Sequence, residues 1–375
     1  MVTVSAVAEG VPADKIKVGF IYIGDENEGY TYSHYKGALE MKKTFGLTDE
    51  QIIVKWLVPE SEACYEAAVD LAEQGCNIIF ANSFGMESYL FQAAKEYPNI
   101  QFCHATGTQA LASELTNVHN YFTAIYEARY VSGVVAGLKL SQMIADGKIK
   151  AEEAKIGYVG AYPFAEVVSG YTSFFLGARS VCPSATMQVT YTNSWASADL
   201  EKAAAEALIA DKCVLISQHA DTTGASTACE AAGVPIVGYN ISMIPTAPTQ
   251  ALTSPTNNWA PYVTFAVKNV IEGTEIPRDW CKGFADDAVT VTELNEKAIA
   301  PGTAEKVAQV EQDIKDGKLH VFDCASFTVG GETVTTFDTA FGFEGNQLVA
   351  DGYFHESELR SAPCFELRID GITEK

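Results

Sequence analysis

A histidine and an aspartate lie two residues apart in the polar segment ISQHADTTGAS. His219 and Asp221 are residue types that can act as acid and base or ligate a metal ion. Either chemistry needs a further nucleophile or ligand, and the chain has no G-x-S-x-G, H-E-x-x-H, P-loop or G-x-G-x-x-G motif. We therefore predict no catalytic residue, no metal site and no cofactor. We expect a loop in which His219 supports a ligand-facing Asp221.

The elements that position this loop are short apolar runs separated by segments of helical period. The expected strands are KVGFIYI, NIIFANS, IQFCHA, KIGYVGA, QVTYTNS, CVLISQH and PIVGYN. The expected helices are SHYKGALEMKKTFG, EACYEAAVDLAEQG, MESYLFQAAKEYP, ARYVSGVVAGLKLSQMIADG, EVVSGYTSFFLGARSV, SADLEKAAAEALIADK and TACEAAG. This alternation predicts an α/β fold with parallel sheets flanked by helices.

The order of elements is repeated once, in residues 62–107 and again in residues 198–240, which predicts two lobes of similar plan. Ligands of open parallel sheets bind beyond the carboxyl ends of the strands. The loops NSFG and QHADTTG both fall there, so we expect a ligand in the cleft between the lobes. The expected domains are a linker at 1–14, a first lobe of 15–125 plus about 250–285, a second lobe of 126–249 plus about 286–309, and a β-rich C-terminal appendage at 310–375.

Aromatic and polar side chains gather at the ends of the expected strands. The aromatic ones are Tyr30, Tyr32, Phe84, Phe164, Trp195, Tyr239 and Trp259. Core packing explains each of them singly, but together they indicate a cleft lined with flat rings, where stacking contributes roughly 1–3 kcal/mol per ring. The polar ones, which can fix the edge of a heterocycle, are Asn82, Ser83, Gln218, Asp221 and Asn240. A planar ligand is therefore expected.

Composition excludes several other partners. The chain of 375 residues has 25 Lys and Arg against 48 Asp and Glu, a formal net charge of −23, and no basic run. Nucleic acid is therefore not an expected partner, and neither is an anionic membrane surface. The nine cysteines show no C-x-x-C spacing, so we predict neither a zinc site nor a disulfide framework, and expect mostly buried side chains.

Residues 15–285 resemble the basic membrane protein family, extracytoplasmic solute-binding lipoproteins that include the purine nucleoside receptors of ABC transporters. The motifs that carry the resemblance are KVGFIYIG, GYTYSHYKGALE, NIIFANSFG, YPNIQFCHATG, YEARYVSGVVAG, KIGYVGAYPFAEVVSGYTSFFLGARSV, NSW, GVPIVGYN and LTSPTNNWAPY. The resemblance implies the type I periplasmic-binding-protein fold, in which two α/β lobes joined by three hinge strands close over a ligand.

The resemblance also implies roles for particular residues. The aromatic pair that sandwiches the purine in the nucleoside receptors matches Tyr30 and Trp195. Two positions depart from the receptors, because Asn240 replaces an acidic residue that reads the base and Asn257 replaces the lysine that contacts the ribose. With these two residues, a free nucleobase such as adenine is at least as compatible with the site as a nucleoside. QHADTTG resembles a variant of the family associated with nucleobases.

The implied function is capture of a purine-type ligand for the membrane permease of an ABC importer. We expect a monomeric extracytoplasmic protein, lipid-anchored in its full precursor, although the opening MVTVSAVAEG shows no signal segment. One alternative is an enzyme acting on nucleosides or nucleobases, with Asp221 and His219 as an acid–base pair. Another is a ligand-sensing regulator, for which about 14 residues before the first strand are too few to form a DNA-binding module.

Overall fold

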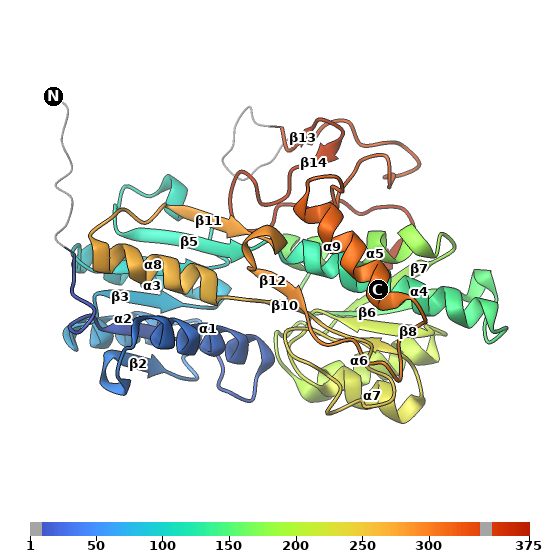
Figure 1. Ribbon diagram of the computed structural model, residues 1–375, viewed down its shortest axis with the longest axis horizontal. Helices are drawn as coiled ribbons and strands as arrows, with labels where there is room; N and C mark the ends of the chain where they lie inside the picture. The colour runs from blue at the N-terminus through green and yellow to red at the C-terminus, as the bar shows by residue number, and fades with distance from the viewer. Residues whose placement is uncertain (1–9, 338–346) are drawn as a thin grey trace. The chain divides into compact units, whose positions relative to one another are not determined.

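The structure is a computed structural model that describes residues 10–337 and 347–375. Residues 1–9 of the expected linker and 338–346 of the expected appendage lie outside the described residues. The chain forms two compact units (Figure 1). Unit 1 comprises Met1–Thr123, Asn258–Lys282 and Arg360–Ala362, and unit 2 comprises Ala124–Asn257, Gly283–Leu359 and Pro363–Lys375. Among the described residues, no helix has the length and apolar character needed to cross a membrane.

Unit 1 contains a parallel sheet with the strand order β11-β5-β4-β3-β1-β2. Its strands are β1 (Val18–Ile21), β2 (Ile52–Lys55), β3 (Ile78–Ala81), β4 (Gln101–Ala105), β5 (Val118–Thr123) and β11 (Asp279–Lys282). The apolar runs predicted β1, β3 and β4, and these strands are confirmed. The strands β2, β5 and β11 were not predicted.

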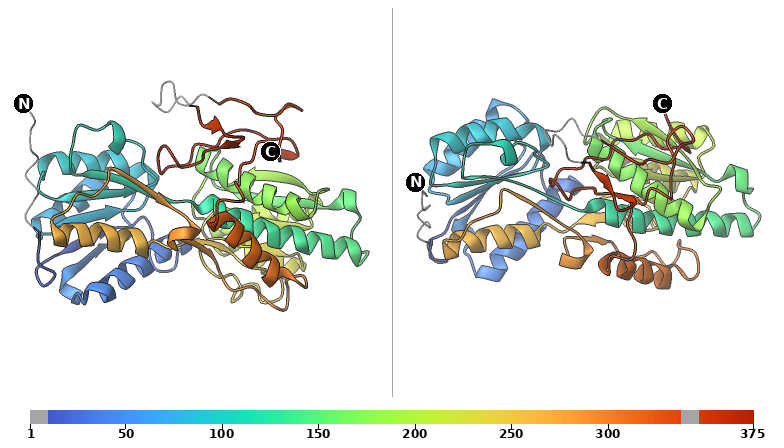
Figure 2. Two further views of the ribbon diagram at one scale, coloured as in Figure 1. Left: turned by 45° about the horizontal axis from the view of Figure 1, so that its top comes forward. Right: turned by 90° about the horizontal axis from the view of Figure 1, so that it is seen from above.

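Helices cover both faces of the unit 1 sheet (Figure 2). They are α1 (Gly29–Phe45), α2 (Glu62–Glu73), α3 (Glu87–Glu96) and α8 (Ala260–Glu272), with α1 packed on α8 and α2 packed on α3. Alternation along the strands divides the core. Phe80 and Tyr121 contact Tyr262 of α8, whereas Ile21 and Ile79 belong to the core cluster that includes residues of α2 and α3.

Unit 2 contains a second parallel sheet with the order β15-β7-β6-β8-β9. Its strands are β6 (Lys155–Gly160), β7 (Thr186–Tyr191), β8 (Leu215–Gln218), β9 (Ile236–Val237) and β15 (Ile372–Glu374). Two antiparallel pairs accompany it, β10 (Pro255–Asn257) with β12 (Val289–Val291), and β13 (Val349–Ala350) with β14 (Tyr353–Phe354). The expected strands within 155–161, 188–194, 213–219 and 235–240 are confirmed, and the end of the chain adds β15 at the edge.

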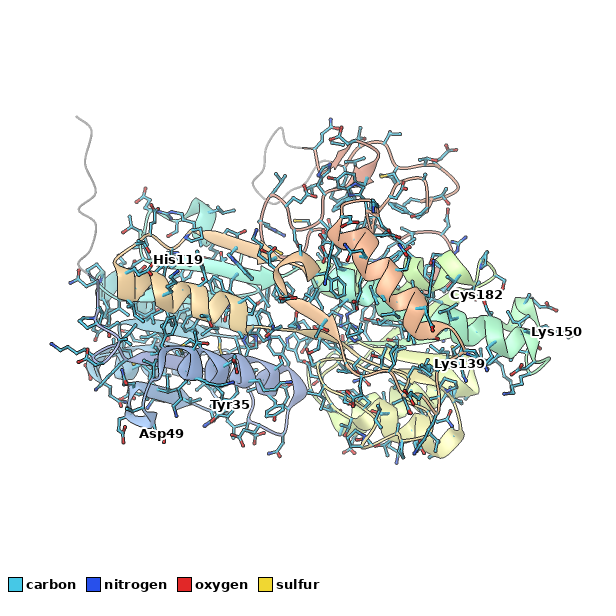
Figure 3. All side chains as sticks on the ribbon, viewed as in Figure 1. Tyr35, Asp49, His119, Lys139, Lys150 and Cys182 are labelled. Atoms are coloured by element: carbon cyan, nitrogen blue, oxygen red, sulfur yellow. The ribbon has the colours of Figure 1, made fainter. Side chains whose placement is uncertain are left out.

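The helices of unit 2 are α4 (Ile125–Ala145), α5 (Ala165–Val181), α6 (Ala198–Ala210), α7 (Gly224–Ala232) and α9 (Thr303–Lys315). All but α9 were predicted. Side chains fill the space between helices and sheet in each unit (Figure 3), and eight of the nine cysteine side chains are buried, as expected. The α4–α5 contact is formed through backbone at glycine: a Cβ at Gly133 would lie 2.0 Å from the carbonyl oxygen of Phe174, and one at Gly177 would lie 2.0 Å from that of Tyr130.

The close contact between α4 and α5 predicts that adding a single methyl group at Gly133 destabilises the protein. Alanine is a better helix former than glycine by about 1 kcal/mol, yet Gly133→Ala should lower the free energy of unfolding by roughly 1–3 kcal/mol, because the added Cβ forces α4 and α5 apart. Urea unfolding measures this free energy. Gly147→Ala is the comparison variant: a Cβ there meets nothing within 4 Å, so its only cost is the strain of the left-handed φ of +68°, about 1 kcal/mol. A Gly133→Ala protein as stable as the wild type would contradict the close contact.

Candidate functional site

In unit 1, the loops after β1 and β3 are joined through Asn82. Its Oδ1 accepts a hydrogen bond from the backbone N–H of Ile23 (3.0 Å), and its backbone oxygen accepts one from the hydroxyl of Tyr30 (2.7 Å). Glu28 caps α1 by accepting from the N–H groups of Tyr30 (2.5 Å) and Thr31 (2.8 Å). The Tyr30 ring is therefore held at both its backbone and its hydroxyl, which fixes its orientation at the carboxyl end of the sheet.

Trp259 packs behind Tyr30. Its side chain is completely buried, stacks on the ring of His34 at 3.9 Å and meets the Tyr30 ring edge-on at 6.1 Å. The indole Nε1 donates to the hydroxyl of Ser33 at 3.0 Å. Burial holds the pKa of His34 well below its usual range, so this stack is formed by a neutral imidazole. Trp259 thus supports Tyr30 from within the core of unit 1.

The other predicted residues of unit 1 lie at its surface or near it. Phe84 is 47% exposed and Tyr32 is 38% exposed. Ser83 is buried, and its hydroxyl donates to Glu60 Oε1 at 2.6 Å, which also accepts the N–H of Gly85 at 2.7 Å. The Glu60 carboxylate therefore shapes the NSFG loop. No sequence pattern indicated this role, because Glu60 precedes a different helix.

Unit 2 presents a cluster of three aromatic rings beyond β6 and β7. Tyr162 stacks on Phe164, with centroids 5.2 Å apart and an angle of 12°, and meets Trp195 at 5.1 Å and 62°. Phe164 and Trp195 are 6.1 Å apart. Phe164 is 43% exposed and Trp195 is half-buried. Of the three, the sequence predicted Phe164 and Trp195 but missed Tyr162, which follows the same strand as Phe164.

Polar side chains of unit 2 are organised around the loop after β8. Gln218 is fully buried, and its amide donates to the backbone oxygens of Ala220 (2.7 Å) and Thr222 (2.8 Å), which folds the loop back on itself. The N–H of Asp221 donates to the backbone oxygen of Trp195 at 2.9 Å. The carboxylate of Asp221 is thereby placed next to the aromatic cluster.

Asn240 orients the Asp221 carboxylate. Its Nδ2 donates to Asp221 Oδ1 at 2.7 Å, and its Oδ1 accepts from the amide of Asn257 at 3.3 Å. Asn257 also donates to the hydroxyl of Tyr239 at 3.4 Å. The backbone of Asn240 has a φ of +62°, a conformation that asparagine tolerates better than most residues. Tyr239, Asn240, Asn257 and Asp221 therefore form one buried polar group.

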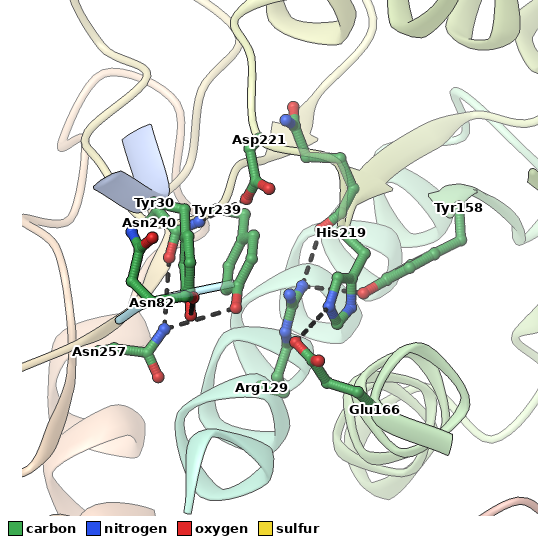
Figure 4. Close-up of polar contacts among 11 residues, drawn as sticks. Tyr30, Asn82, Arg129, Tyr158, Glu166, His219, Asp221, Tyr239, Asn240 and Asn257 are labelled. Atoms are coloured by element: carbon green, nitrogen blue, oxygen red, sulfur yellow. Dashed lines mark hydrogen bonds and ion pairs between the residues drawn. The ribbon is translucent and has the colours of Figure 1, made fainter. Parts of the chain in front are cut away.

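His219 points toward a different set of partners from Asp221 (Figure 4). Its Nε2 lies 3.4 Å from Glu166 Oε1, and the buried Arg129 is close by. Burial lowers the pKa of His219 to about 4, the positive charge of Arg129 acts in the same direction, and Glu166 opposes them. A neutral, fully buried imidazole turned toward Glu166 is arranged to support the loop. In the described residues no group of three or more His, Cys, Asp or Glu side chains could hold a metal ion.

Comparison with known proteins decides the family. The profile of the family described as Bmp, ABC transporter substrate-binding protein PnrA-like, matches residues 15–322. The chain belongs to this family. It is 33% identical over 311 residues to a purine-binding protein of Brucella abortus, covering 82% of this chain and 83% of that protein. It is 27% identical over 316 residues to a putative ABC transporter glucose-binding protein of Haloferax volcanii, covering 84% and 76%.

A solved structure supports the fold. An ABC transporter solute-binding protein of Aeropyrum pernix matches with a TM-score of 0.68 at 17% identity, covering 82% of this chain and 93% of that one. The resemblance seen in the sequence and the type I binding-protein fold are therefore confirmed. Members of the Bmp family are solute-binding proteins, not enzymes, and deliver small molecules to a membrane permease from outside the cytoplasm.

The buried histidines predict acid sensitivity. Below pH 6.5 the unfolded chain binds a proton that folded His219, with its pKa of about 4, does not, so stability present above pH 6.5 is lost as the pH falls toward 4. Between pH 7 and pH 5 this loss amounts to about 2 kcal/mol for one such group. We expect His219→Gln to show a correspondingly smaller change in unfolding free energy between these two pH values, measured by urea titration.

His119 of unit 1 (labelled in Figure 3) provides the comparison, because burial also lowers its pKa to about 4 while its ring contacts the backbone oxygen of Pro277 and the amide of Gln101. His119→Gln should reduce the pH dependence similarly. An unchanged pH dependence in His219→Gln would show that folding does not lower the pKa of His219.

Proposed function

We propose that this protein captures a purine-type ligand, either a nucleobase such as adenine or a purine nucleoside, for an ABC importer. The observation that carries the proposal is the Asp221–Asn240 pair next to the rings of Phe164 and Trp195. A flat hydrophobic surface beside a carboxylate and an amide suits a heterocycle with N–H donors on its edge. The purine-binding relative from Brucella abortus supports this ligand class.

Unit 1 contributes its own aromatic and polar groups to the proposal. Tyr30 is the ring whose orientation is fixed most completely, and the exposed Tyr32 and Phe84 add apolar surface. Asn82 and Ser83 hold the loop that carries Phe84, and Trp259 supports Tyr30. We infer that these residues of unit 1 also take part in binding, so that their substitution weakens it.

A free base is favoured over a nucleoside by the contacts of Asn257. Its amide is 3.4 Å from the hydroxyl of Tyr239 and 3.3 Å from Oδ1 of Asn240, so it completes the buried polar group of unit 2. An asparagine in this role is much shorter than the lysine that the nucleoside receptors use for the ribose. The carboxylate of Asp221 can accept a hydrogen bond from a ring N–H or an exocyclic amine of the base.

A ligand screen by thermal unfolding tests the proposal. A ligand present at about 100 times its Kd stabilises the folded state by roughly 2.7 kcal/mol, which raises the Tm by several degrees. We expect adenine or another free base to raise the Tm. Nucleosides, glucose and amino acids are screened in parallel. Glucose is included because one relative is described as glucose-binding. A rise with glucose alone, in protein freed of any co-purified ligand, would refute the purine assignment.

Substitution of Asp221 tests the site itself. Asp221→Asn should weaken binding by roughly 1–3 kcal/mol, because the ligand donor and the amide of Asn240 both lose a charged acceptor. Isothermal titration calorimetry measures this change. Asp199→Asn, at an exposed position in the first turn of α6, is the matched control and should bind as the wild type does. Equal affinity in the two variants would remove Asp221 from the site.

A further inference from the structure

Arg129 is a fully buried cation that holds the end of β8. It lies in the second turn of α4, with its side chain at 0% exposure. Its Nη1 donates to the backbone oxygen of Gln218 at 2.7 Å and to the hydroxyl of Tyr158 at 2.8 Å (Figure 4). Gln218 is the last residue of β8, three residues before Asp221. The guanidinium therefore fixes the point from which the Asp221 loop departs.

The same guanidinium also holds the second segment of the polar group. Its central carbon lies 3.7 Å from the centroid of the Tyr239 ring, a close cation–π stack. Tyr239 directly precedes Asn240, whose amide donates to Asp221. Arg129 thus contacts both chain segments that meet at the Asp221–Asn240 hydrogen bond, while belonging to neither.

Fold stability does not account for an arginine at this position. Its Nε and Nη2 have no hydrogen-bond partner among the described residues, and a buried donor without a partner is costly. Apolar residues of similar volume often replace buried charges without loss of stability. The guanidinium is planar, so it can donate to the backbone oxygen of Gln218 and stack on the Tyr239 ring at the same time. An apolar residue cannot make both contacts.

We propose that Arg129 is the positioning residue of the unit 2 site, which aligns the loop of Asp221 with Tyr239 and Asn240 so that the carboxylate faces the ligand in one orientation. This inference rests on the proposed function for its ligand. Its geometric part, the alignment of two segments by one guanidinium, is independent of what the ligand is.

Arg129→Met tests the proposal. Arg179→Met is the control, since Arg179 lies in the last turn of α5, over the ring of Phe175 and away from the β8 loop. Adenine is the probe in calorimetry. We expect the Kd of Arg129→Met to rise by about tenfold, as for other supporting partners of a binding site, with a Tm of the ligand-free protein close to that of the wild type. Arg179→Met should leave the Kd unchanged. An unchanged Kd in Arg129→Met would overturn the proposal.

A double-mutant cycle separates positioning from a general structural effect. If Arg129 acts through Asp221, the Arg129→Met, Asp221→Asn protein loses less affinity than the product of the two single losses. Independent losses that multiply would contradict the proposed role. Arg129→Lys should recover little of the affinity, because an ammonium group cannot make both backbone and ring contacts.

Hydrogen exchange of the ligand-free protein gives a result that needs no ligand. We expect faster amide exchange at residues 218–222 and 239–241 in Arg129→Met but not in Arg179→Met. If the wild type binds no purine, the proposed function fails, while this exchange still decides the role of Arg129. Should Arg129→Met not fold, Tyr158→Phe removes one of the two Nη1 partners and should produce the same changes more weakly; wild-type exchange and affinity in that variant would then refute the proposal.

Discussion

The close contact between α4 and α5 is the constraint on which the rest of unit 2 depends. Glycines at 133 and 177 let the two helices meet backbone to backbone, with no side chain between them at these points. This brings Arg129 on α4 and Glu166 on α5 close to His219. The α4–α5 pair therefore determines where the charged groups of Arg129 and Glu166 lie relative to the β8 loop. It also determines how the core packs.

The buried guanidinium in turn governs the ionisation around it. In a medium of low polarity, a cation disfavours a second one, and Arg129 adds to burial in keeping His219 neutral. The same charge opposes the effect of burial on the pKa of Tyr158 and of Tyr239. Carboxylates at 166 and 221 are the nearby anions. The buried carboxylate of Glu201 also holds this loop, by accepting from the N–H of Thr222.

Mainly apolar runs allowed the central strands of both sheets to be predicted, because a strand buried on both faces consists mostly of apolar residues. The missed strands lack this signature. Strand β5 reads VHNYFT, in which His119 and Asn120 are buried through hydrogen bonds, and β2 lies at an edge with only partly buried residues. Predicted site residues follow strands directly, as Trp195 and Asp221 do. Arg129, Glu166 and Glu60 reach their loops from other elements, and no local pattern reveals such a contact.

The two departures from the nucleoside receptors have a common physical explanation. Asn240 donates to Asp221 at 2.7 Å, so a carboxylate at 240 would place two negative charges at hydrogen-bond distance and raise the pKa of one of them. A chain with Asp221 therefore favours a donor at 240, and Asn240 can then accept from the amide of Asn257. Residues 221, 240 and 257 are therefore joined in one hydrogen-bonded unit, in which a substitution at one position alters the contacts of the other two.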